Sequence, residues 1–191
     1  MGSEHPPHGL QEGFDYGPAV LATGPWLKNP VCLTRGTEAF VSQHIGDLAN
    51  RATIEAMEGA ADHLERILDV SPAAVACDRH PDFASTRFAE AVAEERGIPL
   101  VSVQHHHAHI AAVAAEHGLD GPVLGVALDG VGLGDDGGAW GGELIAVDGG
   151  TYERVGHLAP LPLPGGDRAA AEPWRMAAAV LHRLGRAAEV P

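Results

Sequence analysis

The amino-acid sequence predicts an α/β domain in which strands and helices alternate along the chain. Short apolar runs bounded by turn residues, typical of strands, occur between residues 19 and 43 and again from residue 73 onward. Segments with apolar residues at helical spacing separate the later runs. Together these two patterns favour an open sheet with packed helices.

The first half of the chain contains three predicted strands and one long helix. Residues 1 to 17 are rich in glycine, proline and polar groups without periodicity, and they predict a flexible lead-in before a domain over residues 18–191. A long amphipathic helix is expected from about residue 48 to residue 68. We expect short strands at residues 19–23, 30–34 and 39–43, with a turn at 35–38.

The rest of the chain alternates more regularly between strand and helix. Early antiparallel strands followed by strand–helix–strand units indicate an α/β domain of the ribonuclease H-like kind. We expect strands at residues 73–77, 100–103, 123–128 and 142–147, and helices near 85–96, from the histidine run to about 117, and at 172–185.

Composition limits the classes of function. Twelve lysines and arginines stand against 26 aspartates and glutamates, giving a net charge of −14 that disfavours binding to nucleic acid or to an anionic membrane surface. No run approaches the ~18 apolar residues of a membrane-spanning helix, and the first residues lack the pattern of a secretion signal. The two cysteines, Cys32 and Cys77, suit a reducing compartment, so we expect a cytoplasmic protein.

Four histidines within five residues, in the segment 104–110, are the strongest chemical signal of the chain. His105 and His109 lie four residues apart, so on a helix both imidazoles project from one face and can bind one metal ion. The internal position excludes an expression tag, and a solvated helix end more usually carries lysine or glutamate. His106 and His107 point elsewhere on the helix, which leaves support of the ligands, contact with substrate, or packing open for each.

A glycine-rich segment follows the predicted strand at 123–128. Seven of the thirteen residues from Gly130 to Gly142 are glycine, which lets the backbone approach a phosphate or a planar ligand closely. Asp129, just before them, could hold a metal or accept a proton. A tight hairpin between two strands explains the same glycines, and both interpretations stay open. Asp135 and Asp136 argue against a bare phosphate unless a cation lies nearby.

Two shorter segments raise similar alternatives. Residues 77–82, which include His80, follow a predicted strand, where functional residues gather in an open α/β sheet, but they also suit a plain helix-entry turn. Gly165, Gly166 and Asp167 precede the last predicted helix, where they could bind phosphate or ribose or serve only as a cap.

Six motifs in order give the chain a specific resemblance. It resembles the HypF carbamoyltransferases of nickel–iron hydrogenase maturation, in the C-terminal region of that family that is similar to the tRNA-modifying Kae1/TsaD proteins. The resemblance covers nearly all of the chain from about residue 19. The motifs lie at residues 27–29, 42–48, 77–82, 103–109, 127–130 with 140–143, and 164–167 with 172–176.

The resemblance implies a fold, a reaction and a set of site residues. The fold is an actin-like ATPase of two ribonuclease H-like lobes, of which this chain carries the first and the start of the next. The reaction passes a carbamoyl group from carbamoyl adenylate, made from carbamoyl phosphate and ATP in an upstream domain, to the C-terminal cysteine of HypE. The expected residues are His105 and His109 for a divalent metal, zinc or iron; His80 and Asp129 for catalysis; and Lys28, Asp129, Gly130, Gly132, Gly166 and Asp167 for the nucleotide.

The chain departs from the family in what it lacks. It contains no acylphosphatase-like segment, no CxxC zinc modules, no adenylate-forming domain and no complete second lobe. We therefore expect a chain that is inactive alone. It is either a fragment, a truncated gene product, or one part of a split enzyme that completes its site with a second lobe or upstream domain on another polypeptide. A carbamoyltransferase acting on a small-molecule hydroxyl, and a noncatalytic binding module, are the alternatives.

Overall fold

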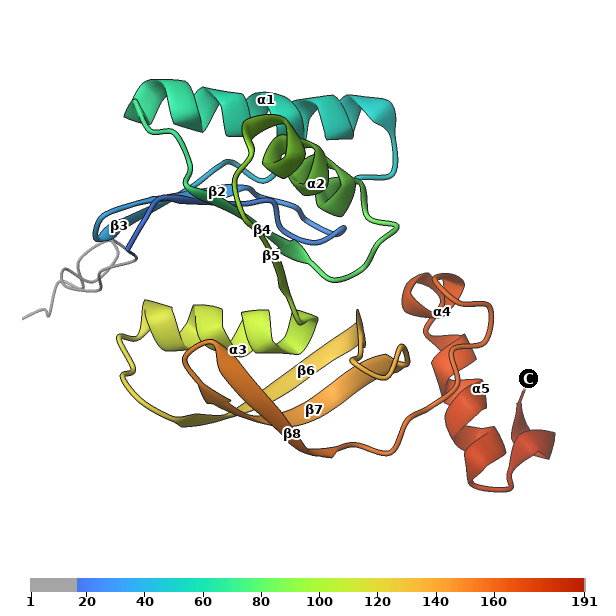
Figure 1. Ribbon diagram of the computed structural model, residues 1–191. Coiled ribbons are helices and arrows are strands. Elements are labelled where there is room, and N and C mark those ends of the chain that lie inside the picture. The colour runs from blue at the N-terminus through green and yellow to red at the C-terminus, as the bar shows by residue number, and fades with distance from the viewer. Residues whose placement is uncertain (1–16, 191) are drawn as a thin grey trace, which may run out of the picture.

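The computed structural model describes residues 17–190, which form two β-sheets with their packed helices (Figure 1). The first sheet has the strand order β3-β2-β1-β4-β5. Strands β1, β4 and β5 run parallel to one another, whereas β2 and β3 are antiparallel to their neighbours. The strands are β1 (Val20–Ala22), β2 (Cys32–Arg35), β3 (Glu38–Val41), β4 (Ala74–Asp78) and β5 (Leu100–Val103).

Two helices cover one face of the first sheet, α1 (Arg51–Leu68) and α2 (Ala84–Arg96) (Figure 1). Helix α1 begins after Asn50, whose side chain accepts the Thr53 N–H, and it ends at Asp69 in the left-handed conformation. Its apolar face packs on the strands. The buried residues of this interface are Leu21, Val31, Leu33, Leu48, Met57, Ala61 and Leu64.

The second sheet is an antiparallel meander with the order β6-β7-β8, and α3 (His105–Glu116) packs on it. In Figure 1 this helix lies between the first sheet and the second. Ile110 of the helix meets Ala127, Ile145 and Val147 of the strands in a small buried core. The strands are β6 (Val123–Leu133), β7 (Ala139–Asp148) and β8 (Thr151–His157).

The last described segment lies beside the second sheet (Figure 1). It contains two helices, α4 (Arg168–Ala171) and α5 (Trp174–Arg183), and a short 3₁₀ helix (Ala187–Glu189). Among residues 17–190, none of the helices has the length and apolar character needed to cross a membrane.

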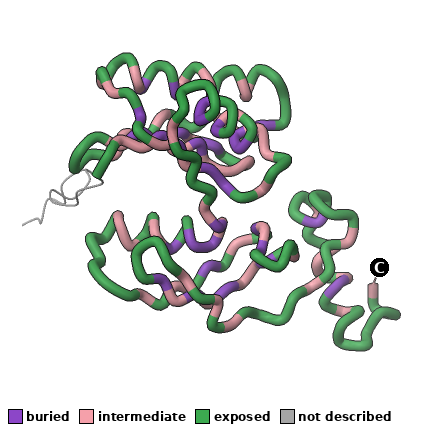
Figure 2. Tube along the Cα trace, in the orientation of Figure 1, coloured by how far each residue is buried: buried purple, intermediate pink, exposed green. Residues whose placement is uncertain are grey.

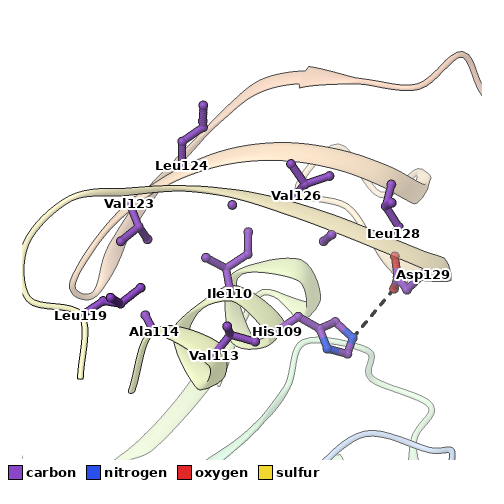
Figure 3. A pocket seen from close by; sticks show the side chains of 12 residues that line it. His109, Ile110, Val113, Ala114, Leu119, Val123, Leu124, Val126, Leu128 and Asp129 are labelled. Atoms are coloured by element: carbon purple, nitrogen blue, oxygen red, sulfur yellow. Dashed lines mark ion pairs between the residues drawn. The ribbon is translucent and has the colours of Figure 1, made fainter. Parts of the chain in front are cut away.

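The outer side of β6 is open. Strand β6 is an edge of its sheet, and Leu124, Val126 and Leu128 on it are 64%, 64% and 73% exposed. Figure 2 shows the second sheet with exposed, intermediate and buried residues interspersed along its strands. A groove of about 370 Å³ runs along β6 and α3, and His109 and Asp129 stand at one end of it (Figure 3).

The predicted elements are largely confirmed, with corrections to two strands, one strand that was missed and one helix that is shorter. The strand predicted at 123–128 extends to Leu133, and the one predicted at 142–147 begins at Ala139, because Gly132 and Leu133 pair with Trp140 and Ala139 beyond an irregularity in the ladder. The strand β8 was not predicted. The helix expected at 172–185 is shorter, at 174–183. The predicted lead-in falls almost wholly outside the described residues.

Candidate metal centre

The two ligand histidines predicted from the sequence face one another on the first turns of α3. His105 Nε2 and His109 Nε2 lie 3.2 Å apart. The helix begins at His105 because Gln104 caps it, its side-chain Oε1 accepting the His107 N–H at 2.9 Å. The cap therefore fixes which turn carries the histidines.

Asp129 of β6 brings a carboxylate to the same point. Its Oδ2 lies 3.2 Å from His105 Nε2 and 4.0 Å from His109 Nε2. With metal–ligand bonds of about 2.0–2.1 Å, the ligand atoms of a tetrahedral zinc ion lie ~3.3 Å apart, so the three separations match such a site with little adjustment. The structure thus adds Asp129 to the predicted histidine pair as a candidate third ligand.

Buried orphan atoms support a cation at this point. Neither carboxylate oxygen of Asp129 makes an aligned hydrogen bond among the described residues, although both are buried, and neither does His106 Nε2, which lies 3.0 Å from Oδ1. Buried polar atoms without partners are rare and call for a satisfying group. Two imidazoles and one carboxylate are a donor set suited to zinc or iron. The residues present therefore fit a divalent metal.

The charges of the centre are balanced between two carboxylates and the imidazoles. Contacts with the carboxylates of Asp129 and Asp78 raise the pKa of His105 to about 9, although burial acts in the opposite direction. Burial would raise the pKa of Asp129, but contact with His105 and the charges of the neighbouring imidazoles outweigh it and lower the pKa. Burial and the charge of His105 lower the pKa of His109. The carboxylates thus favour a positive charge between them, whether a proton or a metal ion.

Asp78 orients His105 from behind. The carboxylate stands at the end of β4, is 8% exposed, and its Oδ2 lies 2.8 Å from His105 Nδ1. A carboxylate on the far nitrogen of a ligating histidine fixes the ring so that its other nitrogen faces the metal. Sequence reasoning did not single out Asp78. The signal was its place at the end of a strand next to β5, which leads directly to His105.

Close packing explains three of the seven glycines of the glycine-rich segment, Gly132, Gly134 and Gly142. A Cβ on Gly132 would lie 2.6 Å from His105 Cδ2, and one on Gly134 would lie 2.1 Å from the Trp140 indole nitrogen. The segment is a hairpin whose turn spans residues 134–138. Asp129, expected at the end of a strand, therefore lies inside β6. At Gly130 nothing lies within 4 Å, so contact with a ligand stays a prediction there.

Replacement of Gly132 by alanine is expected to weaken metal binding. The atoms that the new methyl would meet belong to the His105 side chain, so the ligand itself must move. Overpacking of this kind costs about 1–3 kcal/mol, and we expect zinc affinity to fall ~10-fold or more because 1.4 kcal/mol is a factor of ten. Zinc titration monitored by calorimetry measures the change.

The matched control is Gly59→Ala on α1, where nothing lies within 4 Å of the added methyl. Alanine is favoured over glycine inside a helix by roughly 0.5–1 kcal/mol. This variant should keep its zinc affinity and unfold at a slightly higher temperature. Equal zinc affinity of Gly132→Ala and the unchanged chain would contradict the close approach.

Both carboxylates of the acidic pair in the hairpin have partners within their own surroundings. Asp135 is paired with Arg79 and accepts the Tyr152 hydroxyl proton, and Asp136 accepts the Trp140 indole N–H at 2.9 Å. The arginine comes from the loop after β4, so this contact also links the first sheet to the second. The negative charge of these two residues therefore does not require a further cation.

The other predicted residues differ in how they relate to the centre. The His80 ring stacks on Phe83 with ring centroids 4.2 Å apart. The backbone N–H of His80 donates to Asp78 Oδ1 at 2.8 Å, and the other oxygen of Asp78 contacts His105. Lys28 has a positive φ of 53°, and its N–H donates to Asp47. Across residues 17–190 no hydrogen bond or ion pair joins Lys28, Gly166 or Asp167 to the histidine cluster.

The remaining histidines of the run are turned inward. His107 is buried, with Nε2 3.1 Å from the Gly149 carbonyl oxygen and its ring 4.8 Å from that of Tyr152. His106 is fully buried, and its Nε2 lies 3.0 Å from Asp129 Oδ1. The geometry therefore separates the four histidines into two that face the metal centre and two that are packed.

Comparison with known proteins assigns the chain to one class. The HypF Kae1-like domain family matches residues 15–116, and the second subdomain of the carbamoyltransferase Kae1-like domain matches residues 125–190. The chain therefore belongs to the HypF carbamoyltransferase family and carries part of its Kae1-like domain.

Particular relatives agree with this assignment. The chain is 67% identical over 174 residues to carbamoyltransferase HypF2 of Cupriavidus necator, which covers 91% of this chain and 22% of that protein. A HypF homolog of the same organism is 54% identical over 95% of this chain and 46% of its own length. The crystal structure of full-length HypF in the phosphate- and nucleotide-bound form superposes with a TM-score of 0.81 at 38% identity, over 90% of this chain and 22% of that one. The chain thus spans about a fifth of the length of the HypF2 protein and of this HypF structure.

Proposed function

We propose that this chain supplies the metal-binding part of a HypF-type carbamoyltransferase that acts in the cytoplasm on a HypE-type acceptor protein. The observation that carries the proposal is the convergence of His105, His109 and Asp129 from two elements in a chain of this family. The nucleotide- and phosphate-bound state of the HypF structure supports a nucleotide such as ATP or carbamoyl adenylate as ligand.

The strand order supports an actin-like ATPase fold. The first sheet places β1 between an antiparallel β2 and a parallel β4, which is the arrangement expected of a ribonuclease H-like lobe. The second sheet repeats the first three strands of this pattern, with β6, β7 and β8 in the places of β1, β2 and β3. Two such lobes, the second of them partial, agree with the fold that we expected from the motifs.

The transfer chemistry assigns roles to the residues of the centre. A divalent metal bound by His105, His109 and Asp129 would act as a Lewis acid toward the carbamoyl group. The thiol sulfur of the acceptor attacks the carbamoyl carbon, a C–S bond forms, the C–O bond to AMP breaks, and AMP leaves with the electron pair. His80 is our candidate to take the thiol proton, since Asp78 holds its backbone next to the centre.

The two cysteines of the chain are poorly suited to act as the nucleophile of this reaction. Burial raises the pKa of the Cys32 thiol and of the Cys77 thiol, and Cys77 is only 3% exposed. Buried thiols of raised pKa are poor nucleophiles. The proposed nucleophile is therefore a thiol of the acceptor protein.

The proposed contacts for the nucleotide are the backbone of Gly130 and the residues Lys28, Gly166 and Asp167.

A chimeric enzyme tests the proposal. Residues 15–190 of this chain would replace the matched segment of the Cupriavidus necator HypF2 protein, which supplies the other segments. We expect the chimera to attach a carbamoyl group to the C-terminal cysteine of HypE when given carbamoyl phosphate and ATP, as a mass increase of the intact acceptor.

The same chimera with His105→Ala and His109→Ala is the control, and it should leave the acceptor unmodified. A chimera that folds and binds zinc but never modifies HypE would overturn the assigned acceptor and reaction. Carbamoylation of a small-molecule hydroxyl in its place would point to the alternative acceptor class.

A further inference from the structure

His106 is a buried histidine of the run with a polar atom close to each of its ring nitrogens. It is fully buried, its Nδ1 lies 3.1 Å from Gln104 Nε2, and its Nε2 lies 3.0 Å from Asp129 Oδ1. The ring also packs near Trp140, with centroids 6.1 Å apart. A ring held in this way has a defined protonation pattern, which its neighbours reveal.

The orientation of the Gln104 amide determines that pattern. Its Oε1 accepts the His107 N–H at 2.9 Å, and its Nε2 donates to the Leu133 carbonyl oxygen at 3.2 Å. A backbone N–H can only donate and a carbonyl oxygen can only accept, so these two contacts independently require the same amide orientation. The NH₂ group of Gln104 therefore faces His106.

The tautomer of His106 follows from this amide. Because Gln104 Nε2 is a donor, His106 Nδ1 must be the acceptor, and a neutral ring then carries its proton on Nε2. Asp129 Oδ1 is an acceptor 3.0 Å from that nitrogen, although the two atoms are not aligned as a hydrogen bond in this structure. A nitrogen that bears a proton cannot ligate a metal, so the network removes His106 from the ligand set despite its position beside His105.

We propose that Gln104 and His106 form a positioning relay that directs the Asp129 carboxylate toward the metal. In this relay the Nε2–H of His106 engages Oδ1, 3.0 Å away, and leaves Oδ2, the oxygen near His105 and His109, for the ion. The relay rests on the metal site of the proposed function. It gives the carboxylate ligand the kind of support that Asp78 gives to His105.

Nitrogen-15 spectroscopy of the 191-residue chain tests the tautomer directly. Long-range proton–nitrogen correlation should show the proton of His106 on Nε2, both without metal and after addition of one equivalent of zinc chloride. The same addition should shift the Nε2 resonances of His105 and His109. A proton on Nδ1 of His106, or a zinc-dependent shift of its Nε2 to the value of a metal-bound nitrogen, would overturn the proposal.

Two substitutions test the positioning role. His106→Leu removes the donor, and we expect zinc affinity to fall about 10–100-fold. His106→Gln can place an amide N–H near the position of Nε2 and should recover most of this loss, which a structural role of the imidazole ring alone would not allow. Unchanged zinc affinity in a folded His106→Leu chain contradicts the relay.

The result is separable from the test of the proposed function. The spectrum and the zinc titration require neither the acceptor protein nor the nucleotide, whereas the chimera requires both. If His106→Leu does not fold, the spectrum of the unchanged chain still decides the tautomer. If the chimera does not modify the acceptor but the spectrum shows the His106 proton on Nε2, the proposed reaction is rejected and the relay is retained.

Discussion

Purified chain should bind close to one equivalent of zinc, and the double variant His105→Ala, His109→Ala should bind none. The two imidazoles supply two of the three candidate ligand atoms, which lie 3.2 to 4.0 Å apart in the structure. Loss of both leaves only the Asp129 carboxylate, so affinity should fall by more than the ~10–100-fold that follows loss of an outer partner of a ligand. Elemental analysis and calorimetric titration measure both quantities.

The control for this experiment is His63→Ala, His117→Ala, which removes two histidines outside the cluster. His63 lies on α1 and His117 follows the last residue of α3. This variant should bind zinc as the unchanged chain does. Absence of zinc from the unchanged chain would mean that the chain retains the family's shape without a working centre of its own.

Ile145→Ala is expected to be the most destabilising single truncation in the second sheet. Ile145 is fully buried and packs with Ile110 and Ala127 beneath the histidine helix. Truncation of a buried isoleucine to alanine costs about 2–5 kcal/mol, because it removes transfer free energy and leaves a cavity. Urea unfolding followed by circular dichroism would report this loss as a lower midpoint.

The same substitution at an exposed site provides the comparison. Ile67 on α1 is 60% exposed, and Ile67→Ala should change the free energy of unfolding by no more than about 0.5 kcal/mol. Because Ile110 stands in the middle of α3, loosening its contact should also reduce zinc affinity in Ile145→Ala. Equal midpoints of the two variants would show that this core does not carry the stability assigned to it.

The metal centre was predictable from the sequence only where it is local. The pair His105 and His109 is separated by one helical turn, so spacing alone brings the two rings together. Asp78 and Asp129 reach the same point from two different strands, and only the tertiary arrangement of β4, α3 and β6 shows which atoms meet. The motifs indicated Asp129 as a site residue but not the oxygen that faces the metal.

The fold shows the same boundary between local and nonlocal information. Apolar spacing predicted α1 and the three strands before it, because their buried faces have a regular period. The glycine-rich segment has no such period. Gly132 allows the His105 side chain of α3 to pack closely, and Gly134 allows the same for Trp140 of β7. Strand β8 was missed, although the Gly149–Gly150 pair before it is a hairpin signal.

The open edge of β6 has a practical consequence for solution studies of this chain. A long strand with unpaired backbone groups and exposed apolar side chains is a template for pairing with strands of other molecules. Asp129 lies within this strand, so such pairing would occur within reach of the zinc ligands. We therefore expect self-association to accompany metal loading in concentrated samples, and a dilution series separates the two equilibria.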